Sequence, residues 1–379
     1  MGFLKKYYYL IIIIFLSACS ASLIKINVKL PSYLHPIYGN SSQRNFYYSV
    51  QLSDNIKSLW RSNTYGGFNN SSVVLYDSLV FVADLTGRVY TFNINNGKQL
   101  GVIKTKGTIF STPLVFNYRV YYPLVRVEDK ITELIVYDFF IGKEIYRIEI
   151  EDLITNQILY EENYLYLISD DGTVYKYSLE MNLIWKSETY QEVNCVPALN
   201  NNDLFIGNSS GELLKLDKND GKIIIRKKLS SRFLSGITIS NNTLFIGDDE
   251  GNLLSLKSSD LKLNFRVNTN SRIIMNPVVD ESNIFIGNLA GDFFCYDKFN
   301  GNIKWSKKLN GLFNSTPIAT INRIIVPDSF KAIWILDKTD GTIIKKIELE
   351  GRAKLSPVLV NNKLIIGYDD GILEAYEFN

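Results

Sequence analysis

The sequence predicts an all-β fold, an eight-bladed β-propeller with four-stranded antiparallel blades whose last blade is closed by an N-terminal strand. A unit of about forty residues recurs eight times between positions 55 and 379. Each unit contains four short runs rich in Ile, Val, Phe and Tyr, separated by Asn, Asp and Gly. The last unit lacks its fourth run, and a run of that kind precedes the first unit. The chain is also 46% hydrophobic, which is too apolar for a disordered protein.

The repeat keeps its register over this whole range. Steps of forty residues join the equivalent positions, and one step of forty-four marks an insertion in the second repeat. The equivalent positions are Val73, Pro113, Gln157, Pro197, Ile237, Pro277, Pro317 and Pro357. Fourteen residues later, five repeats carry a turn glycine: Gly87, Gly211, Gly251, Gly291 and Gly371. Twenty-four residues later, four repeats carry a second glycine: Gly97, Gly221, Gly301 and Gly341.

The four runs within each repeat are predicted to be strands. In the sixth repeat they span residues 277–280, 284–287, 292–297 and 303–308. The segments between them carry the residues of tight hairpin turns. Four antiparallel strands per unit, repeated eight times, indicate a propeller, with a solenoid as the alternative.

The segment before the first repeat favours a closed ring. Trp60 lies thirteen residues before Val73, close to the twelve residues that separate Trp185 from Pro197. Residues 55–61 therefore match the outer strand that the last repeat lacks. Pairing between the two would remove both exposed edges of the array, with Trp60 in a buried slot.

The start of the chain has the pattern of a secretion signal. In residues 1–18, Lys5 and Lys6 precede an apolar stretch at 7–16, which is too short to span a bilayer. The sequence Leu-Ser-Ala-Cys that follows resembles the lipobox of bacterial lipoproteins. This resemblance implies that Cys19 carries the lipid. An ordinary signal peptide with a chance cysteine is the alternative.

Residues 19–54 are interpreted as a lipidated tether that precedes the propeller domain at 55–379. Acyl chains on the cysteine are expected to hold it stably to a membrane. Ser20 follows the cysteine, and by resemblance to sorted lipoproteins it favours the periplasmic side of the outer membrane. Part of the tether, such as residues 46–48, is expected to pack on the side of the propeller.

The composition excludes several classes of function. The 41 Lys and Arg residues balance 39 Asp and Glu residues, so the chain lacks the basic surplus that nucleic-acid binding needs. The single histidine, His35, precedes the repeats, which removes histidine-based catalysis from the folded body. Cys195 and Cys295 fall in non-adjacent blades, which favours buried thiols over a disulfide.

The repeat pattern Pro-Val-Val, Phe-Ile-Gly, Gly-Asp, Tyr-Asp, Asn-Gly, Trp resembles that of quinoprotein-type propellers. Eight such repeats after a lipoprotein signal, with a three-strand last repeat, resemble the BamB family of the outer-membrane β-barrel assembly machinery. This resemblance implies a non-enzymatic scaffold without a cofactor. It also implies binding to the periplasmic POTRA domains of a BamA-type barrel-assembly protein, beside other assembly lipoproteins. We expect a monomer.

A quinone-dependent dehydrogenase is the least favoured alternative. Such enzymes resemble one another in a vicinal cysteine pair, a calcium site and a tryptophan platform, and this chain has no adjacent cysteines. Three of its four tryptophans, Trp60, Trp185 and Trp305, are expected on outer strands, and Trp334 on a third strand. The acidic turns before Gly172, Gly251 and Gly371 each offer two or three carboxylates, fewer oxygens than calcium requires, so they are interpreted as hairpin turns.

The loops between blades contain the candidate partner-binding residues. Arg232, Arg272 and Arg352 recur at multiples of forty, which places them on one face around the channel mouth. Phe233 and Phe313 occupy the next position of the repeat. Arginine beside aromatic residues is typical of protein interfaces. The alternative is that the apolar position packs between blades and the arginines are solvated.

Two further features are predicted to belong to this candidate surface. Leu229, with Arg232, has the residue types of the loop by which the BamB family, by resemblance, contacts the barrel-assembly protein, although it lies one blade later than expected. The lengthened hairpin of the second repeat carries Arg126 and Glu128 and should rise from the same face.

A propeller that binds a sugar or another small ligand in its channel is the second functional hypothesis. Convergent aromatic and acidic side chains in the lining near Pro277 and Pro317 would favour it, and small apolar side chains would not.

Overall fold

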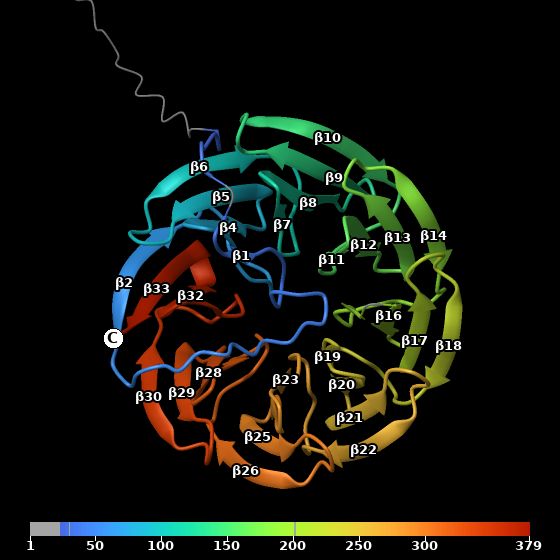
Figure 1. Cartoon of the computed structure of the whole chain (residues 1–379), viewed down its shortest axis with the longest axis vertical. Helices are drawn as coiled ribbons and strands as arrows, with labels where there is room; N and C mark the ends of the chain where they lie inside the picture. The colour runs from blue at the N-terminus through green and yellow to red at the C-terminus, as the bar shows by residue number, and fades with distance from the viewer. Residues whose placement is uncertain (1–22, 30, 201) are drawn as a thin grey trace, which may run out of the picture.

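The computed structural model describes residues 23–29, 31–200 and 202–379, and these form eight β-sheets arranged as a ring around a central channel (Figure 1). Each sheet is one blade, with a short strand at the channel and a longer strand at the rim. We number the blades 1–8 in the chain order of their innermost strands. The predicted fold class, an eight-bladed propeller with a closed last blade, is confirmed.

The strands of the first four blades follow one another along the chain. Blade 1 contains β3 (Val74–Tyr76), β4 (Leu79–Ala83), β5 (Arg88–Asn93) and β6 (Gln99–Lys104). Blade 2 contains β7 (Leu114–Phe116), β8 (Arg119–Arg126), β9 (Ile131–Asp138) and β10 (Lys143–Ile150). Blade 3 contains β11 (Leu159–Glu161), β12 (Tyr164–Ile168), β13 (Thr173–Ser178) and β14 (Leu183–Glu188). Blade 4 contains β15 (Ala198–Leu199), β16 (Asp203–Gly207), β17 (Glu212–Asp217) and β18 (Ile223–Lys228).

The remaining blades repeat this order until the ring closes. Blade 5 contains β19 (Thr238–Ser240), β20 (Thr243–Gly247), β21 (Asn252–Lys257) and β22 (Leu263–Asn268). Blade 6 contains β23 (Val278–Val279), β24 (Asn283–Gly287), β25 (Asp292–Asp297) and β26 (Ile303–Lys308). Blade 7 contains β27 (Ile318–Ala319), β28 (Arg323–Asp328), β29 (Ala332–Asp337) and β30 (Ile343–Glu348). Blade 8 contains β31 (Val358–Val360), β32 (Lys363–Tyr368), the 3₁₀ turn η1 (Asp369–Gly371), β33 (Ile372–Phe378) and, from the other end of the chain, β2 (Ile56–Asn63).

The ring is closed by β2, which pairs antiparallel with β33 over the whole length of the strand. Trp60 on β2 is 7% exposed, and its indole N–H donates to the carbonyl of Ile94 in blade 1 at 2.7 Å. Trp60 therefore joins blade 8 to blade 1. The closing strand predicted at 55–61 is confirmed and extends two residues further.

In four repeats the second glycine accommodates the aromatic residue of the preceding blade. A Cβ atom added to Gly97 would lie 2.6 Å from the ring of Trp60, and one added to Gly341 would lie 2.6 Å from Trp305. Both glycines also have a positive φ, which other residues adopt at a cost. The spacing of these aromatic residues and glycines in the sequence therefore reflects one packing contact between neighbouring blades.

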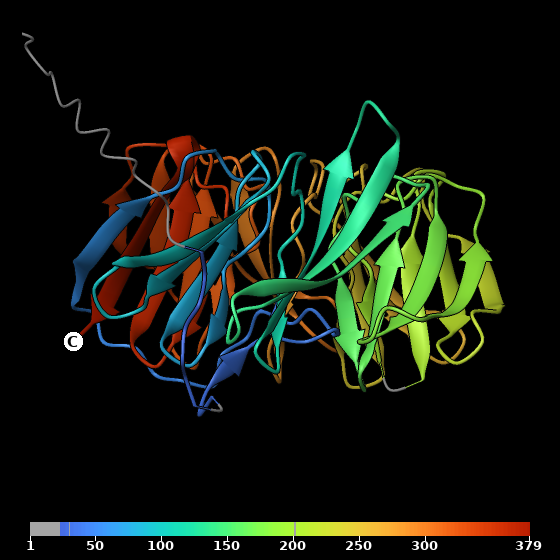
Figure 2. The ribbon, with the colours of Figure 1, turned by 90° about the horizontal axis from the view of Figure 1, so that it is seen from above.

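The segment between residues 31 and 54 enters the channel, which corrects the expectation that its aromatic residues pack on the side of the propeller (Figures 1 and 2). The strand β1 (Leu34–His35) adds to the channel-side edge of β3. Phe46 is 2% exposed and packs edge-on against Tyr38 with ring centroids 5.0 Å apart. Beyond it, Tyr47 lies alongside β27.

Unpaired backbone groups on the innermost strands explain this path. The channel-side edge of each innermost strand presents N–H and C=O groups that need partners when buried. The N-terminal segment supplies acceptors to several blades: Val115 N–H donates to Pro36 O, Leu199 N–H to Ser42 O, Ile239 N–H to Gln43 O and Ile321 N–H to Val50 O, at 2.8–2.9 Å. We call residues 31–54 the channel segment.

Arg44 holds the middle of the channel segment. Its side chain is fully buried, and its guanidinium donates to the carbonyls of Tyr38, Ile158 and Pro197 at 2.5, 2.6 and 3.3 Å. Carbonyl dipoles from blades 3 and 4 thereby compensate a buried charge. Within the described residues, no helix is long and apolar enough to cross a membrane.

Candidate partner-binding face

One face of the ring is built from two kinds of loop, and we call it the loop face. The first kind joins the outer strand of one blade to the inner strand of the next, and the second joins the two middle strands of a blade. Backbone hydrogen bonds hold the two kinds together, as in Asp249 N–H to Arg232 O and Asp369 N–H to Arg352 O, both 3.1 Å. The β8–β9 hairpin projects from this face in Figure 2.

The structure places the three predicted arginines on the loop face. The side chains of Arg272 and Arg352 are 50% and 59% exposed. Arg272 forms an ion pair with Asp249, and the Nε of Arg352 donates to Asp369 at 2.7 Å. This carboxylate contact raises the pKa of Arg352. Arg232 is less exposed, and partner binding by any of the three stays a prediction.

The two predicted phenylalanines do not reach the surface, so their assignment as contact residues is corrected. Phe233 and Phe313 are both 0% exposed. Each phenylalanine packs over a glycine that leaves room for it. A Cβ atom added to Gly287, for example, would lie 2.7 Å from the ring of Phe313. Phe293 packs edge-on against Phe313 at 5.9 Å. They anchor the loops between blades, as the alternative interpretation of the repeat position required.

The other predicted contacts differ in how much surface they offer. Leu229 is half-buried and packs against the core of blades 4 and 5. Arg126 pairs with Glu133 and Glu149 at 3.3 and 3.2 Å, so carboxylates of its own blade compensate its charge. Glu128 is exposed at the tip of the hairpin, beside Val127, which is 54% exposed.

The loop face also carries three exposed aromatic residues that the repeat pattern did not predict. Tyr65, Tyr190 and Phe330 are 74%, 77% and 64% exposed. The guanidinium of Arg88 lies 3.6 Å from the ring centroid of Tyr65, a cation–π contact. A signal was present at Phe330, because the same turn position carries Thr86, Ser210, Glu250, Ala290 or Asp370 in other repeats.

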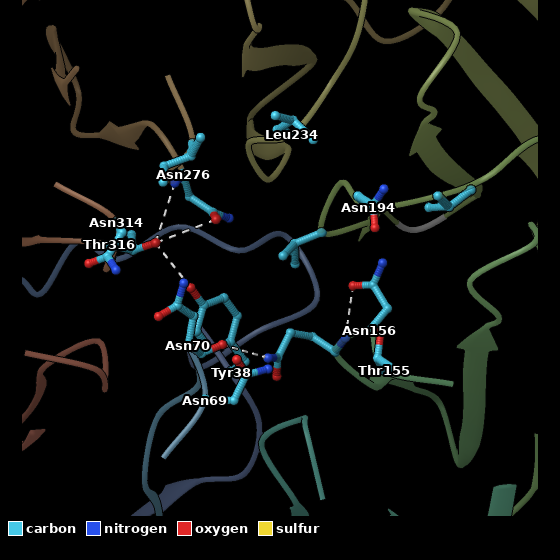
Figure 3. Close-up of a pocket in the computed structure, with 14 residues that line it drawn as sticks. Tyr38, Asn69, Asn70, Thr155, Asn156, Asn194, Leu234, Asn276, Asn314 and Thr316 are labelled. Atoms are coloured by element: carbon cyan, nitrogen blue, oxygen red, sulfur yellow. Dashed lines mark hydrogen bonds between the residues drawn. The ribbon is translucent and has the colours of Figure 1, made fainter. Parts of the chain in front are cut away.

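The mouth of the channel on this face is a cavity of about 200 Å³ lined mainly by amide and hydroxyl side chains (Figure 3). Tyr38 of the channel segment forms part of it, and its hydroxyl lies 3.0 Å from that of Thr316. Residues forty positions apart bond across neighbouring blades, as in Asn276 N–H to Thr316 Oγ1 at 3.3 Å and Thr316 N–H to Ser356 Oγ at 3.1 Å.

This lining matches neither pattern considered for a channel ligand. No acidic residue is among the described residues that line the cavity, and Tyr38 is its one aromatic residue. The lining is not small and apolar either. Most of its polar groups bond to the protein itself, although the Nδ2 atom of Asn276 has no partner among the described residues. The polar ring therefore joins blades to one another, which leaves the channel-ligand hypothesis with little support.

The residues considered for quinone chemistry are dispersed. Cys195 and Cys295 are free and buried, and burial raises the pKa of each thiol to about 12. The indole of Trp334 donates to Asp328 within blade 7 at 2.5 Å, away from the channel lining. No cluster of three His, Cys, Asp or Glu side chains that could hold a metal occurs in the described part of the chain.

The acidic turns are stabilised by their own carboxylates. In the turn of blade 5, Asp248 is 0% exposed, and its Oδ1 atom accepts the N–H groups of Glu250 and Asn252 at 2.9 and 2.7 Å. Aspartate is favoured in such turns because its side chain bonds to the backbone two residues on. This supports the interpretation of these turns as structural.

Comparison with known proteins identifies relatives at two levels. A family model described as "Outer membrane protein assembly factor BamB" matches residues 170–272 and 265–377. No curated protein sequence matches the chain. The crystal structure of BamB from Moraxella catarrhalis superposes with a TM-score of 0.72 at 16% identity, covering 86% of this chain and 100% of that one.

Two dehydrogenases share the same architecture. A europium-containing methanol dehydrogenase superposes with a TM-score of 0.76 at 9% identity, covering 91% of this chain and 98% of that one. The quinohemoprotein alcohol dehydrogenase ADHIIG of Pseudomonas putida gives a TM-score of 0.75 at 9% identity, covering 94% and 82%. At such identities these structures show the common fold alone.

Proposed function

Because the chain belongs to the family of the outer membrane protein assembly factor BamB, we propose that it is a non-enzymatic scaffold of the machinery that assembles outer-membrane β-barrels. In this proposal it binds the periplasmic POTRA domains of a BamA-type barrel-assembly protein, beside other assembly lipoproteins. It acts as a monomer without a cofactor. The family match supports this assignment over the dehydrogenases, which share only the fold with this chain.

The proposal includes an anchored location. Cys19 carries the lipid, and the propeller stands at the periplasmic side of the outer membrane. The residues around Cys19 lie outside the described residues, so the support here is the lipobox pattern Leu-Ser-Ala-Cys and the family itself. Several acyl chains on one cysteine anchor a protein stably, whereas one chain binds reversibly.

The observation that carries partner binding is an arc of exposed residues across blades 7, 8 and 1 of the loop face. Phe330 lies in blade 7, Arg352 in the loop into blade 8, and Tyr65 in the loop from blade 8 into blade 1. We call these three residues the aromatic arc. Exposed aromatic rings beside arginine are the composition that protein interfaces concentrate at their centres. The rigid blades beneath hold the arc in one shape, which reduces the entropy lost on binding.

The test is affinity capture of the barrel-assembly protein from detergent-solubilised envelope. Wild type is compared with a triple variant, Tyr65→Ala, Phe330→Ala and Arg352→Glu, and with the double variant Arg232→Glu, Arg272→Glu. The matched control is Phe299→Ala, which removes a 72% exposed aromatic ring from the opposite face. Unchanged circular dichroism and melting temperature ensure that each variant is folded.

We expect wild type and the Phe299 control to capture the barrel-assembly protein and the aromatic-arc variant to lose at least about tenfold in affinity, which corresponds to about 1.4 kcal/mol. Capture by every variant would leave the assembly function standing and place the contact elsewhere. Loss only in the double arginine variant would move the contact to blades 5 and 6. If wild type captures nothing, the assembly function itself is wrong.

A further inference from the structure

The chain docks on the outside of the ring before it enters the channel. Ile24 is 0% exposed, and its carbonyl accepts the hydroxyl of Tyr137 in blade 2 at 2.9 Å. Ile26 N–H donates to Phe139 O at 2.8 Å. Residues 24–26 are therefore bound at the rim between blades 1 and 2, the region at the top of Figure 1 where β6 meets β10.

The dock replaces a contact that other blade pairs make with an aromatic residue. At the interface of blades 3 and 4, Trp185 on the outer strand packs over Gly221. The equivalent of Trp185 in blade 1 is Gly101, and the equivalent of Gly221 in blade 2 is Gly142. No aromatic side chain of the described residues fills the slot between Gly101 and Gly142, and residues 24 and 25 of the N-terminal segment occupy it instead.

Contacts with both glycines show how closely the chain fits this slot. A Cβ on Gly101 would lie 2.8 Å from the Cα of Ile24, and one on Gly142 would lie 3.0 Å from the Cβ of Lys25. A larger residue at either glycine would displace the segment. The slot is thus part of the repeat architecture and does not depend on an incidental surface contact.

This dock limits how far the ring can stand from a lipid anchor. Ile24 follows Cys19 by five positions in the chain. A fully extended chain advances at most about 3.6 Å per residue, so the dock lies within about 18 Å of the lipid-bearing cysteine. If Cys19 is lipidated, the rim of blades 1 and 2 is therefore held within reach of the bilayer.

The surface beside the dock has the composition of a membrane-contacting patch. Phe140 and Ile141, in the turn between β9 and β10, are 44% and 46% exposed, and Leu23 is 63% exposed. The exposed Lys25 and Lys143 flank them. Aromatic and aliphatic side chains bordered by lysine are favoured at the surface of a bilayer with anionic headgroups. We call these five residues the rim patch.

We propose that the rim patch rests on the membrane surface, so that the ring stands on its edge and the loop face is free for its partner. This inference rests on the lipid anchor of the proposed function and names the surface that the anchor presents to the membrane. The occupant is a lipid bilayer, because the short connection to Cys19 leaves the patch within reach of one.

Quenching by lipid-borne spin labels in vesicles of phosphatidylethanolamine and phosphatidylglycerol tests the orientation. The full lipidated chain carries one fluorophore, attached through Phe140→Cys, Phe299→Cys or Phe330→Cys. Phe299 is a matched control, because it occupies the same turn position in blade 6, on the opposite side of the ring (Figure 1). In both turns an aspartate side chain accepts the phenylalanine N–H at 3.0 Å. Phe330 reports the loop face.

We expect severalfold stronger quenching at position 140 than at positions 299 and 330. Equal quenching at 140 and 299 would show that the ring lies flat on the face opposite the loop face. Strongest quenching at 330 would show that the loop face lies on the membrane. Vesicle-bound protein without quenching at 140 would show a ring held away from the bilayer. Each of these results overturns the proposal.

The same preparation separates this inference from the assembly function. If the chain does not float with vesicles, the proposed lipid anchor is wrong, and so is the orientation that depends on it. Capture of the barrel-assembly protein, measured on the chain without its lipid, does not depend on either result. Cys195 and Cys295 do not compete for the fluorophore, because both are buried.

Discussion

At the residue scale, His35 couples the channel segment to pH. Its side chain is 1% exposed and stacks on Tyr48 with ring centroids 6.2 Å apart. Neither ring nitrogen has a hydrogen-bond partner among the described residues. Burial lowers the pKa of His35 to about 3, because the charged form would lose its hydration without gaining an ion pair.

The sign of the effect follows from proton binding. Between the ordinary pKa of about 6.5 and the folded value, the unfolded chain binds a proton that the folded chain does not. Stability therefore falls as the pH drops through this window. We expect the free energy of unfolding of wild type to fall by about 1.4 kcal/mol more than that of a His35→Phe variant between pH 7.5 and 5.5. One extra proton bound by the unfolded chain changes this free energy by about 1.4 kcal/mol per pH unit, and it does so only below the ordinary pKa of about 6.5.

Urea unfolding at the two pH values measures this difference. Carboxylates titrate alike in both proteins, so their contribution cancels, and phenylalanine keeps the ring against Tyr48. Parallel pH profiles would mean that His35 is protonated in the folded state and that the channel segment admits water.

At the element scale, the channel segment acts as a shared edge partner for many blades. Antiparallel hairpins complete each blade, but the channel-side edges remain unpaired until residues 31–54 bond to them. A net contribution of about 0.5–1.5 kcal/mol per hydrogen bond makes this segment a considerable part of the total stability.

A variant that begins at Asn55 tests this role and keeps β2. We expect a folded ring whose amides at Val115, Leu199, Ile239 and Ile321 exchange hydrogen at least about tenfold faster, since each loses its acceptor. Amides between β20 and β21 serve as the control because their partners remain. Equal protection with and without the segment would contradict the assigned role.

At the scale of the whole molecule, closure joins the two ends of the chain. β2 is followed along the chain by blade 1 but is hydrogen-bonded to β33 of blade 8, so the other strands of blade 8 are held to blade 1 by strand pairing and not by a continuous chain. The buried Trp60 and its bond to Ile94 O hold this junction. A ring without it has two free edges.

Trp60→Ala and Trp185→Ala compare the closing junction with an ordinary one. Both indoles pack over the second glycine of the next repeat and donate to a backbone carbonyl, at 2.7 and 3.2 Å. We expect Trp60→Ala to cost about 3–5 kcal/mol and Trp185→Ala to cost less, because Trp185 is less buried and all four strands of its blade are consecutive in the chain.

Chemical denaturation followed by circular dichroism measures both values. If Trp185→Ala costs as much as Trp60→Ala, closure contributes nothing beyond the packing of one indole.

Predictions from the sequence succeeded where every repeat faces the same surroundings. Gly97 and Gly341 could be assigned to one structural position because each blade packs on its neighbour in the same way. The closing role of Trp60 followed from the same period. These contacts join residues that are close in the chain or one repeat apart, so the spacing of residue types in the sequence is enough to predict them.

Contacts outside the period required the folded ring. The path of Arg44 through the channel joins carbonyls of blades 3 and 4, and no repeat anticipates it. Phe233 and Phe313 had the residue type of an interface but lie buried, whereas Tyr65 and Phe330 are exposed. Burial of a loop residue and the filling of a channel depend on atoms far apart in the chain, which a repeat pattern does not specify.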